Sequence, residues 1–361
     1  EEVTFVNEKA NNITFSGTLT LPKNINKPPV VILISGSGPQ NRNEELANHK
    51  PFLVISDYLT NNGIAVLRYD DRGTAKSEGD FKTATSYDFS LDAEAAVNYL
   101  KTRNDVDTNK IGLIGHSEGG LIAPMLAARN KDIAFIVLLA GPGVNGKTIL
   151  ETQTRRAGEL AGAPKVALDA NEALTNIIYG AVVKYPDFDM AKTEIKAELN
   201  NYKSQNPDAL YSNLINDTFI NQQINAVKPL WLQYFIRTNP QDFLSKTHCP
   251  VLAINGSKDF QVLPKLNLNA IESGLKLANN NDVTIKELEG LNHLFQTAKT
   301  GSGSEYATIE ETFSSKALEL IKDWILKVYF PDFRFGNCTS FFVVQGEKTV
   351  SNLYLYKILF G

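Results

Sequence analysis

The stretch GHSEGG, residues 115–120, places Ser117 between two glycines, after an apolar run and before a helix-like segment. A serine at the tip of a sharp strand-to-helix turn strains the backbone and crowds the residues two before and two after it, which favours Gly115 and Gly119. The dipole of the following helix stabilises negative charge that develops there. The pattern predicts that Ser117 is a nucleophile on an elbow. A glycine-rich turn that only starts a helix is the alternative.

A serine hydroxyl is a weak nucleophile near neutral pH, so it needs a base, and the base needs an orienting acid. In folds that carry this elbow, the acid and then the histidine follow the serine along the chain. Of the four histidines, His49 precedes the nucleophile, and His116 adjoins it where its side chain is not expected to reach the hydroxyl. His248 precedes a strand, at the opposite end of the sheet. His293, in GLNHLFQ, is therefore the predicted base; a surface-loop histidine is the alternative.

The predicted acid is Asp259, in the segment GSKDFQVLP that directly follows the apolar run VLAIN. This places Asp259 at the carboxyl end of a strand, on the same side as the elbow. Asp282 is the main rival, but it stands at the start of its strand and so at the wrong end. The alternative role for Asp259 is to cap its own loop.

Two backbone N–H groups must bind the oxyanion of a tetrahedral intermediate. One predicted donor is the amide of Glu118, directly after the nucleophile. The other is the amide of Ser37 in ISGSGPQNRNEE, where Gly36 and Gly38 let the backbone approach the substrate. A plain turn is the alternative for this loop. A phosphate cradle is disfavoured, since no Walker lysine follows.

The segments between these motifs indicate how they are positioned. Apolar runs without polar alternation predict strands buried on both faces of a parallel sheet, and helix-period segments lie between them. The runs are at 30–35, 64–69, 111–115, 133–140, 251–255 and 283–289. VTFVN and NITFSGTLTLP alternate apolar and polar residues and predict an N-terminal antiparallel hairpin. We therefore expect an α/β fold with a mostly parallel central sheet flanked by helices, with its site at the carboxyl ends of the strands.

One long segment breaks this alternation, because it holds amphipathic segments and no strand-like run. It predicts a helical cap inserted into the core, so that 1–143 and 246–328 form the core, 144–245 the cap and 329–361 a C-terminal extension of unknown role. Trp231, Tyr234 and Phe235 of the cap are candidates for the substrate pocket. Aromatic residues at this spacing are also typical of a helix core.

The composition excludes several classes of function. A net charge of -4, a pI near 5.7 and the lack of a basic block argue against nucleic acid as a partner. No apolar run approaches the roughly 20 residues that span a bilayer, so we expect no membrane insertion. Cys249 and Cys338 are the only cysteines, and no His and carboxylate cluster has ligand spacing, so we expect no metal and no cofactor. Since the chain starts at Glu1 without Met, we expect a processed or trimmed protein that is exported or periplasmic.

Five motifs in order carry a family resemblance: ISGSGPQNRNE, RYDDRGTAKSEGDF, GHSEGG, NGSKDFQV and GLNHLFQTAKTGSGSEY. They resemble the α/β-hydrolase superfamily, and more narrowly the bacterial serine esterases of the EstD type, which are grouped with serine aminopeptidase-like hydrolases. The resemblance implies an α/β-hydrolase fold and a carboxylesterase for short acyl esters. It implies Ser117, Asp259 and His293 as the triad, and the amides of Ser37 and Glu118 as the oxyanion hole. Residues 71–73, Asp-Arg-Gly, resemble the family's structural turn, and such residues more often brace a loop than do chemistry.

Three other functions remain open from the sequence. Amide or aminopeptidase activity would need an anionic subsite for the substrate ammonium, and carbohydrate-ester deacetylation would use the same triad. A binding protein that kept the fold and lost the chemistry usually lacks a triad member, whereas all three are present here in order. We expect a small-molecule ester as the substrate. The sequence does not predict an oligomeric state.

Overall fold

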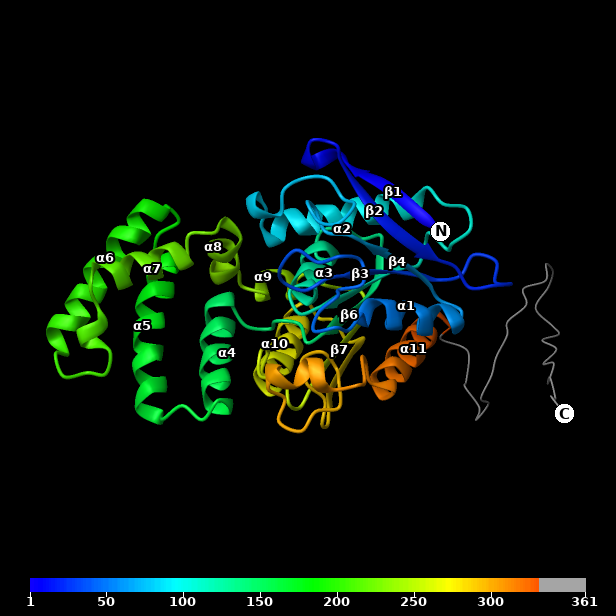
Figure 1. Ribbon diagram of the computed structural model, residues 1–361. Coiled ribbons are helices and arrows are strands. Elements are labelled where there is room, and N and C mark those ends of the chain that lie inside the picture. Colours follow the sequence, from blue (N-terminus) through cyan, green and yellow to red (C-terminus); the bar gives the residue numbers. More distant parts are fainter. Residues whose placement is uncertain (331–361) are drawn as a thin grey trace.

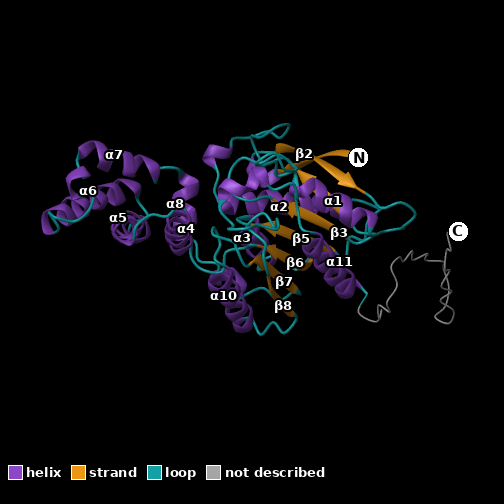
Figure 2. Cartoon of the chain, turned by 60° about the horizontal axis from the view of Figure 1, so that its bottom comes forward, coloured by secondary structure: helices purple, strands orange, loops and turns teal. Residues whose placement is uncertain are grey.

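A twisted eight-stranded sheet forms the centre of the molecule in the computed structural model, which describes residues 1–330 (Figures 1 and 2). The strands lie in the order β1-β2-β4-β3-β5-β6-β7-β8. β2 pairs antiparallel with both β1 and β4, and the other neighbours pair in parallel. The strands are β1 (Glu2–Asn7), β2 (Ile13–Thr20), β3 (Val30–Ile34), β4 (Ala65–Tyr69), β5 (Ile111–His116), β6 (Ile133–Leu139), β7 (Val251–Gly256) and β8 (Val283–Leu288). The predicted α/β class and N-terminal antiparallel hairpin are confirmed.

The inner strands are buried on both faces, as unbroken apolar runs predict. In β3, Ile32 packs into one apolar layer and the adjacent Leu33 packs into the other. The prediction of two buried faces is wrong for β8, which is an edge strand with Lys286 and Glu287 exposed. Charged side chains on an edge strand discourage pairing with another chain, which explains why this run ends in charges.

Helices cover both faces of the sheet. One layer holds α1 (Pro51–Asn61) and α11 (Ser315–Tyr329), and the other holds α2 (Ser86–Lys101), α3 (Gly119–Ala127) and α10 (Pro264–Leu277). Both layers bury apolar side chains directly against the strands, so the positions of the strand ends are fixed from both sides. Short 3₁₀ turns lie at η1 (Glu8–Ala10), η2 (Phe81–Thr83), η3 (Ser212–Leu214) and η4 (Gly303–Thr308).

Helix α2 shows how local sequence sets these elements. Thr85 and Asp88 form a capping box, in which each side chain bonds the backbone N–H of the other residue. Ala93, Val97 and Leu100 then recur at helical spacing and are buried against the sheet. The helix therefore begins at a fixed residue and presents a fixed face.

A helical insertion follows β6 and precedes β7. It consists of α4 (Gly146–Leu160), α5 (Lys165–Lys184), α6 (Phe188–Gln205), α7 (Asp217–Ala226), α8 (Leu230–Arg237) and α9 (Gln241–Leu244). Helices α5, α6 and α7 stand away from the sheet, whereas α4 and α8 lie between them and the part of the molecule that holds the sheet (Figure 1). The outer helices have an apolar core of their own, which includes Ile178, Ile195 and Ile220. The insertion thus has a hydrophobic interior separate from that of the sheet.

The start of α4 contacts the end of α8 in this insertion. The N–H of Gly146, at the start of α4, donates to the carbonyl of Thr238, which follows α8, at 3.1 Å. A Cβ at Gly146 would lie 1.8 Å from the carbonyl oxygen of Phe235, so glycine is required for this close approach.

Within residues 1–330, no helix combines the length and the apolar character needed to cross a membrane. The predicted extension at 329–361 lies outside the described residues from 331 onward.

Candidate active site

Ser117 lies between the end of β5 and the start of α3, with its backbone in the left-handed region at φ 52°. A Cβ at Gly115 would lie 2.0 Å from the carbonyl oxygen of Gly119, and a Cβ at Gly119 would lie 2.1 Å from that of Ile34. No side chain fits at either position. The two glycines therefore permit the strained turn that presents the serine hydroxyl.

Three side chains that are far apart in the sequence meet at this turn. Nε2 of His293 lies 3.1 Å from Oγ of Ser117, and Nδ1 of the same ring lies 2.8 Å from Oδ2 of Asp259. Asp259 and His293 are buried, whereas Ser117 is partly exposed. In this geometry the imidazole can take the serine proton while the carboxylate stabilises the resulting charge.

The acid is held by its own loop, which follows β7. Oδ1 of Asp259 accepts hydrogen bonds from the backbone N–H groups of Gln261 at 2.7 Å and Val262 at 2.9 Å. The carboxylate thus caps its loop with one oxygen and faces His293 with the other. The capping role that the sequence offered as an alternative is present together with the contact to the base.

The remaining histidines and the rival acid lie elsewhere or make other contacts. His49 is bonded to the Thr312 hydroxyl and to the carbonyl of Tyr306. His248 and Asp282 are exposed, and each lies before the first residue of a strand, at the end of the sheet away from Ser117. His116 is buried and directed away from the Ser117 hydroxyl, toward Glu44 and the backbone of His293.

The loop after β3 runs beside the nucleophile. A Cβ at Gly36 would lie 3.2 Å from Cβ of Ser117. The amide of Gly36 donates to Oε1 of Glu44 at 2.6 Å, so it is already engaged. The next amide in the loop is that of Ser37, and the amide of Glu118 lies at the start of α3, directly after the nucleophile. These are the two amides that the sequence suggested for the oxyanion.

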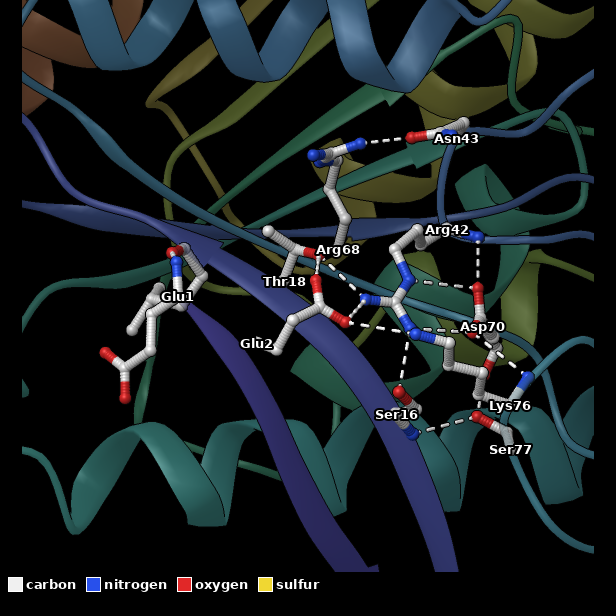
Figure 3. Close-up of polar contacts among 11 residues, drawn as sticks. Glu1, Glu2, Ser16, Thr18, Arg42, Asn43, Arg68, Asp70, Lys76 and Ser77 are labelled. Carbon is white, nitrogen blue, oxygen red and sulfur yellow. Dashed lines mark hydrogen bonds and ion pairs between the residues drawn. The ribbon is translucent and has the colours of Figure 1, made fainter.

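Arg42 anchors this loop to the N-terminal hairpin (Figure 3). Its guanidinium donates to both carboxylate oxygens of Asp70, at 3.1 and 2.8 Å, and its backbone N–H also donates to Asp70 at 2.8 Å. The same guanidinium donates to the hydroxyls of Ser16 and Thr18 on β2, and to Glu2 on β1. The hairpin therefore supports the loop that borders Ser117.

The turn after β4 supplies a second anchor. The Ser35 hydroxyl and the Gln40 amide donate to the two oxygens of Asp71, at 2.7 and 2.9 Å. Desolvation raises the pKa of Asp71 to about 8, although these two hydrogen bonds act against the rise. Next to it, Arg72 makes a two-point contact with the buried Asp92, at 2.7 and 2.6 Å. Asp71 and Arg72 thus brace loops and do not contact the triad.

The three aromatic residues proposed for the pocket have different surroundings. Phe235 is buried in an apolar cluster with Leu121 and Met125 of α3. Trp231 is partly exposed and stacks on Phe235, with ring centroids 5.5 Å apart. Tyr234 is also partly exposed and packs at the edge of the same cluster. This cluster joins α8 of the insertion to the helix that follows the nucleophile.

Comparison with known proteins agrees with this architecture. The model of the family described as serine aminopeptidase, S33, matches residues 50–297, which is more than half of the chain. The chain belongs to this family of α/β-hydrolases. The predicted α/β-hydrolase fold and family resemblance are confirmed.

The relatives of this S33-family member carry different names, esterases and a peptidase among them. Esterase EstD of Thermotoga maritima is 26% identical over 313 residues, and the match covers 86% of this chain and 65% of EstD. The chain thus spans about two thirds of the length of that relative. An esterase of Pyrococcus furiosus, Pf2001, has a TM-score of 0.55 at 17% identity, covering 91% of this chain and 90% of that one. Proline iminopeptidase of Mycobacterium smegmatis has a TM-score of 0.53 at 14% identity, covering 92% and 100%.

The Glu118 side chain has a role that the sequence analysis missed. Its Oε1 accepts hydrogen bonds from the Ser86 hydroxyl at 2.6 Å and from Nε1 of Trp231 at 2.7 Å. Burial raises the pKa of Glu118, and the contacts with Ser86, Trp231 and Ser37 oppose that rise. The carboxylate therefore connects the elbow with α2, the insertion and the loop after β3. The sequence analysis assigned a role only to the backbone amide of Glu118.

Glu44 was missed as well, although it is the last residue of the motif ISGSGPQNRNE. It lies eight residues after Gly36 in an irregular loop with a left-handed backbone at φ 50°. Its carboxylate contacts the amide of Gly36 in the same loop and the ring of His116 at the end of β5. Among residues 1–330, no group of three or more His, Cys, Asp or Glu side chains is arranged to hold a metal ion.

Proposed function

We propose that this chain is a serine carboxylesterase that cleaves short-chain acyl esters through an acyl-enzyme intermediate. The observation that carries the proposal is the continuous chain of contacts from Ser117 through His293 to Asp259, next to a loop whose amides can bind an oxyanion. Kinship with EstD favours ester substrates. A short acyl group is favoured because packed apolar side chains fill the space between α3 and the insertion.

In the proposed reaction, Ser117 attacks the ester carbonyl while Nε2 of His293 takes the hydroxyl proton. The carboxylate of Asp259 accepts a hydrogen bond from Nδ1–H and stabilises the imidazolium. The amides of Ser37 and Glu118 bind the oxyanion of the tetrahedral intermediate. His293 then gives its proton to the leaving alkoxide, so that an alcohol departs. Water, activated by the same histidine, hydrolyses the acyl-serine and releases the acid.

The test is a chain-length series of p-nitrophenyl esters, from acetate to laurate, with purified wild type and Ser117→Ala. We expect activity to peak at acetate or butyrate and to vanish in Ser117→Ala. Ser273→Ala is a matched control, because that exposed serine bonds only within α10. Turnover retained by Ser117→Ala would refute the mechanism. A peak at laurate would refute the short-acyl preference.

The family description favours one second candidate, cleavage of amides at a free amino terminus. Such a substrate carries an ammonium group and needs a carboxylate that can face it. Glu118 is the carboxylate next to the nucleophile, but Ser86 and Trp231 already donate to it. Aminoacyl naphthylamides test this candidate directly, and a higher kcat/KM on them than on any ester would replace the esterase assignment. Failure of Ser117 to react with a fluorophosphonate probe would instead indicate a binding protein.

A further inference from the structure

His116, the residue before Ser117, has both ring nitrogens next to hydrogen-bond acceptors. Its Nδ1 lies 2.9 Å from Oε1 of Glu44, and its Nε2 lies 3.0 Å from the backbone oxygen of His293. A carbonyl oxygen can only accept. A neutral imidazole carries one N–H and can donate only once, whereas an imidazolium donates twice. Because Oε1 of Glu44 also accepts the Gly36 amide at 2.6 Å, this oxygen is placed as an acceptor, and both contacts of the ring are then satisfied when His116 is protonated.

The surroundings of this pair are apolar. Phe52, Leu139, Leu294 and Phe313 line the same small space as the two charged side chains. In such a medium, electrostatic attraction is strong and separation of the partners is costly. The pair is thus held together by its environment as well as by its hydrogen bond.

Several groups face the His116 ring from the elements around it. Burial lowers the pKa of His116, whereas the Glu44 carboxylate, the carbonyl of His293 and the charge of Asp259 raise it. The raising contributions are larger together, so the pKa lies above its ordinary value. The His293 ring lies 4.9 Å away between centroids. Ser117 follows it directly in the chain. The negative groups face it from the loops after β3 and β7, so they favour the charged form.

Three catalytic loops converge on the pair. Oε1 of Glu44 accepts the Gly36 amide at 2.6 Å, which fixes the loop that leads into Ser37. His116 ends the strand that carries Ser117. Its Nε2 contacts the backbone of His293, which carries the base. One ion pair therefore touches the oxyanion loop, the nucleophile strand and the base loop.

We propose that Glu44 and His116 are positioning residues, and that His116 remains an imidazolium throughout the working pH range. This inference rests on the proposed serine-hydrolase function. By holding the Gly36 amide, Glu44 directs the next amide of the loop toward the oxyanion. By holding the backbone of His293, His116 keeps Nε2 of the base in line with the Ser117 hydroxyl. Neither residue transfers a proton in the reaction.

The protonation state can be measured without any substrate. Ring-nitrogen NMR shifts of uniformly labelled wild-type protein, with its four histidines, are recorded from pH 6 to 8. We expect His116 to show two protonated nitrogens at every pH. Substitution of His49, His248 and His293 by Gln, one at a time, assigns its signals by elimination, so the assignment does not depend on a His116 variant. One unprotonated ring nitrogen in His116 at pH 7 would overturn the proposal.

The positioning role is tested by kcat per active site, with active sites titrated by a fluorophosphonate. Glu44→Gln keeps the shape of the side chain but removes its charge, and we expect kcat to fall about 10- to 100-fold, with KM changed less than about twofold. Glu45→Gln, one residue later on the exposed surface, is the matched control and should match wild type. A purely structural role would reduce the number of titrated sites but not kcat per site. Equal kcat in Glu44→Gln and Glu45→Gln would overturn the proposal.

The two proposals can fail separately. If the wild type hydrolyses no ester and does not react with the fluorophosphonate, the proposed function falls, and the NMR measurement still decides whether His116 is charged. If the wild type is an active esterase and His116 is neutral, only the positioning proposal falls. A Glu44→Gln protein that does not fold leaves the decision to the NMR measurement.

Discussion

The two sides of the candidate site are built in different ways. On the acid–base side, Asp259 and His293 act through their own side chains. Asp259 is held by amides of its own loop and by the His293 ring, and the backbone of His293 also contacts His116. On the oxyanion side, the proposed donors are backbone amides, and the loop that carries one of them is held by side chains from distant parts of the chain. Arg42 reaches the N-terminal hairpin, and Asp71 reaches back from the turn after β4.

This difference teaches where single substitutions should matter. A side chain that takes part in the reaction has no substitute, so its removal should lower kcat strongly and leave stability nearly unchanged. A backbone amide is kept in every substitution of its own residue except proline, but it can be displaced by loss of any of its supports. We therefore expect one large fall in kcat for a substitution on the acid–base side and several smaller falls for substitutions on the oxyanion side. Only the substitutions on the oxyanion side should also lower the free energy of unfolding.

The largest effect is expected for Asp259→Asn. The amide keeps the shape of the side chain but favours the wrong tautomer of His293, so kcat should fall by about 10⁴, with little change in melting temperature. Asp282→Asn, on an exposed residue, is the matched control and should leave kcat unchanged. A loss of less than about tenfold would mean that another group orients the base.

Arg42→Ala comes next and tests the other side. It removes the ion pair with Asp70, whose side chain is 3% exposed, and should lower the free energy of unfolding by roughly 3 kcal/mol. Since the oxyanion loop loses its anchor, kcat per titrated site should also fall by about 10- to 100-fold. Lys76→Ala, which removes an exposed partner of the same Glu2, is the control. Lower stability with an unchanged kcat would show that the loop keeps its place without Arg42.

Asp71→Asn should change how stability depends on pH. The folded pKa of Asp71 is about 8, above the ordinary value of 3.8, so the folded state holds this proton more tightly than the unfolded state. Its contribution to stability is complete below pH 3.8 and is lost as the pH rises toward 8. Urea unfolding at pH 5 and pH 8 should therefore show Asp71→Asn gaining stability relative to wild type at the higher pH. A constant difference would place the Asp71 pKa near its ordinary value.

The smallest effect is expected for Trp231→Phe. This change removes the hydrogen bond to Glu118 but keeps an aromatic ring against Phe235. Loss of one such bond costs about 1 kcal/mol, so we expect kcat/KM to fall about fivefold. Trp231→Leu, which also loses the ring stacking, should have a larger effect. Equal activity of Trp231→Phe and wild type would show that contact between the insertion and the elbow does not affect catalysis.

The sequence predicted those parts of the molecule in which one local pattern decides the outcome. The elbow follows from glycines at fixed spacing, and the ends of the strands follow from apolar runs bounded by turns. The order of serine, acid and base then left His293 as the remaining histidine, and in the structure it contacts both Ser117 and Asp259.

What the sequence did not reveal depends on the folded path of loops. Glu44 has no periodic neighbours, and its contact with His116 spans 72 residues. Trp231 and Glu118 are 113 residues apart, and nothing in either local pattern marks the pair. The exposed face of β8 was missed because position at the edge of a sheet is a property of the whole topology and not of one strand.

The way in which the helical insertion is attached has a consequence for changes made in it. The hydrogen bond from Gly146 to Thr238 holds α4 against the end of α8, and Trp231 and Phe235 of α8 join the insertion to the elbow and to α3, whereas the outer helices have an apolar interior of their own. A change in the outer helices α5, α6 and α7 should therefore reach the elbow mainly through α4 and α8, so that it can alter the surroundings of Ser117 by degrees while the strands keep their pairing.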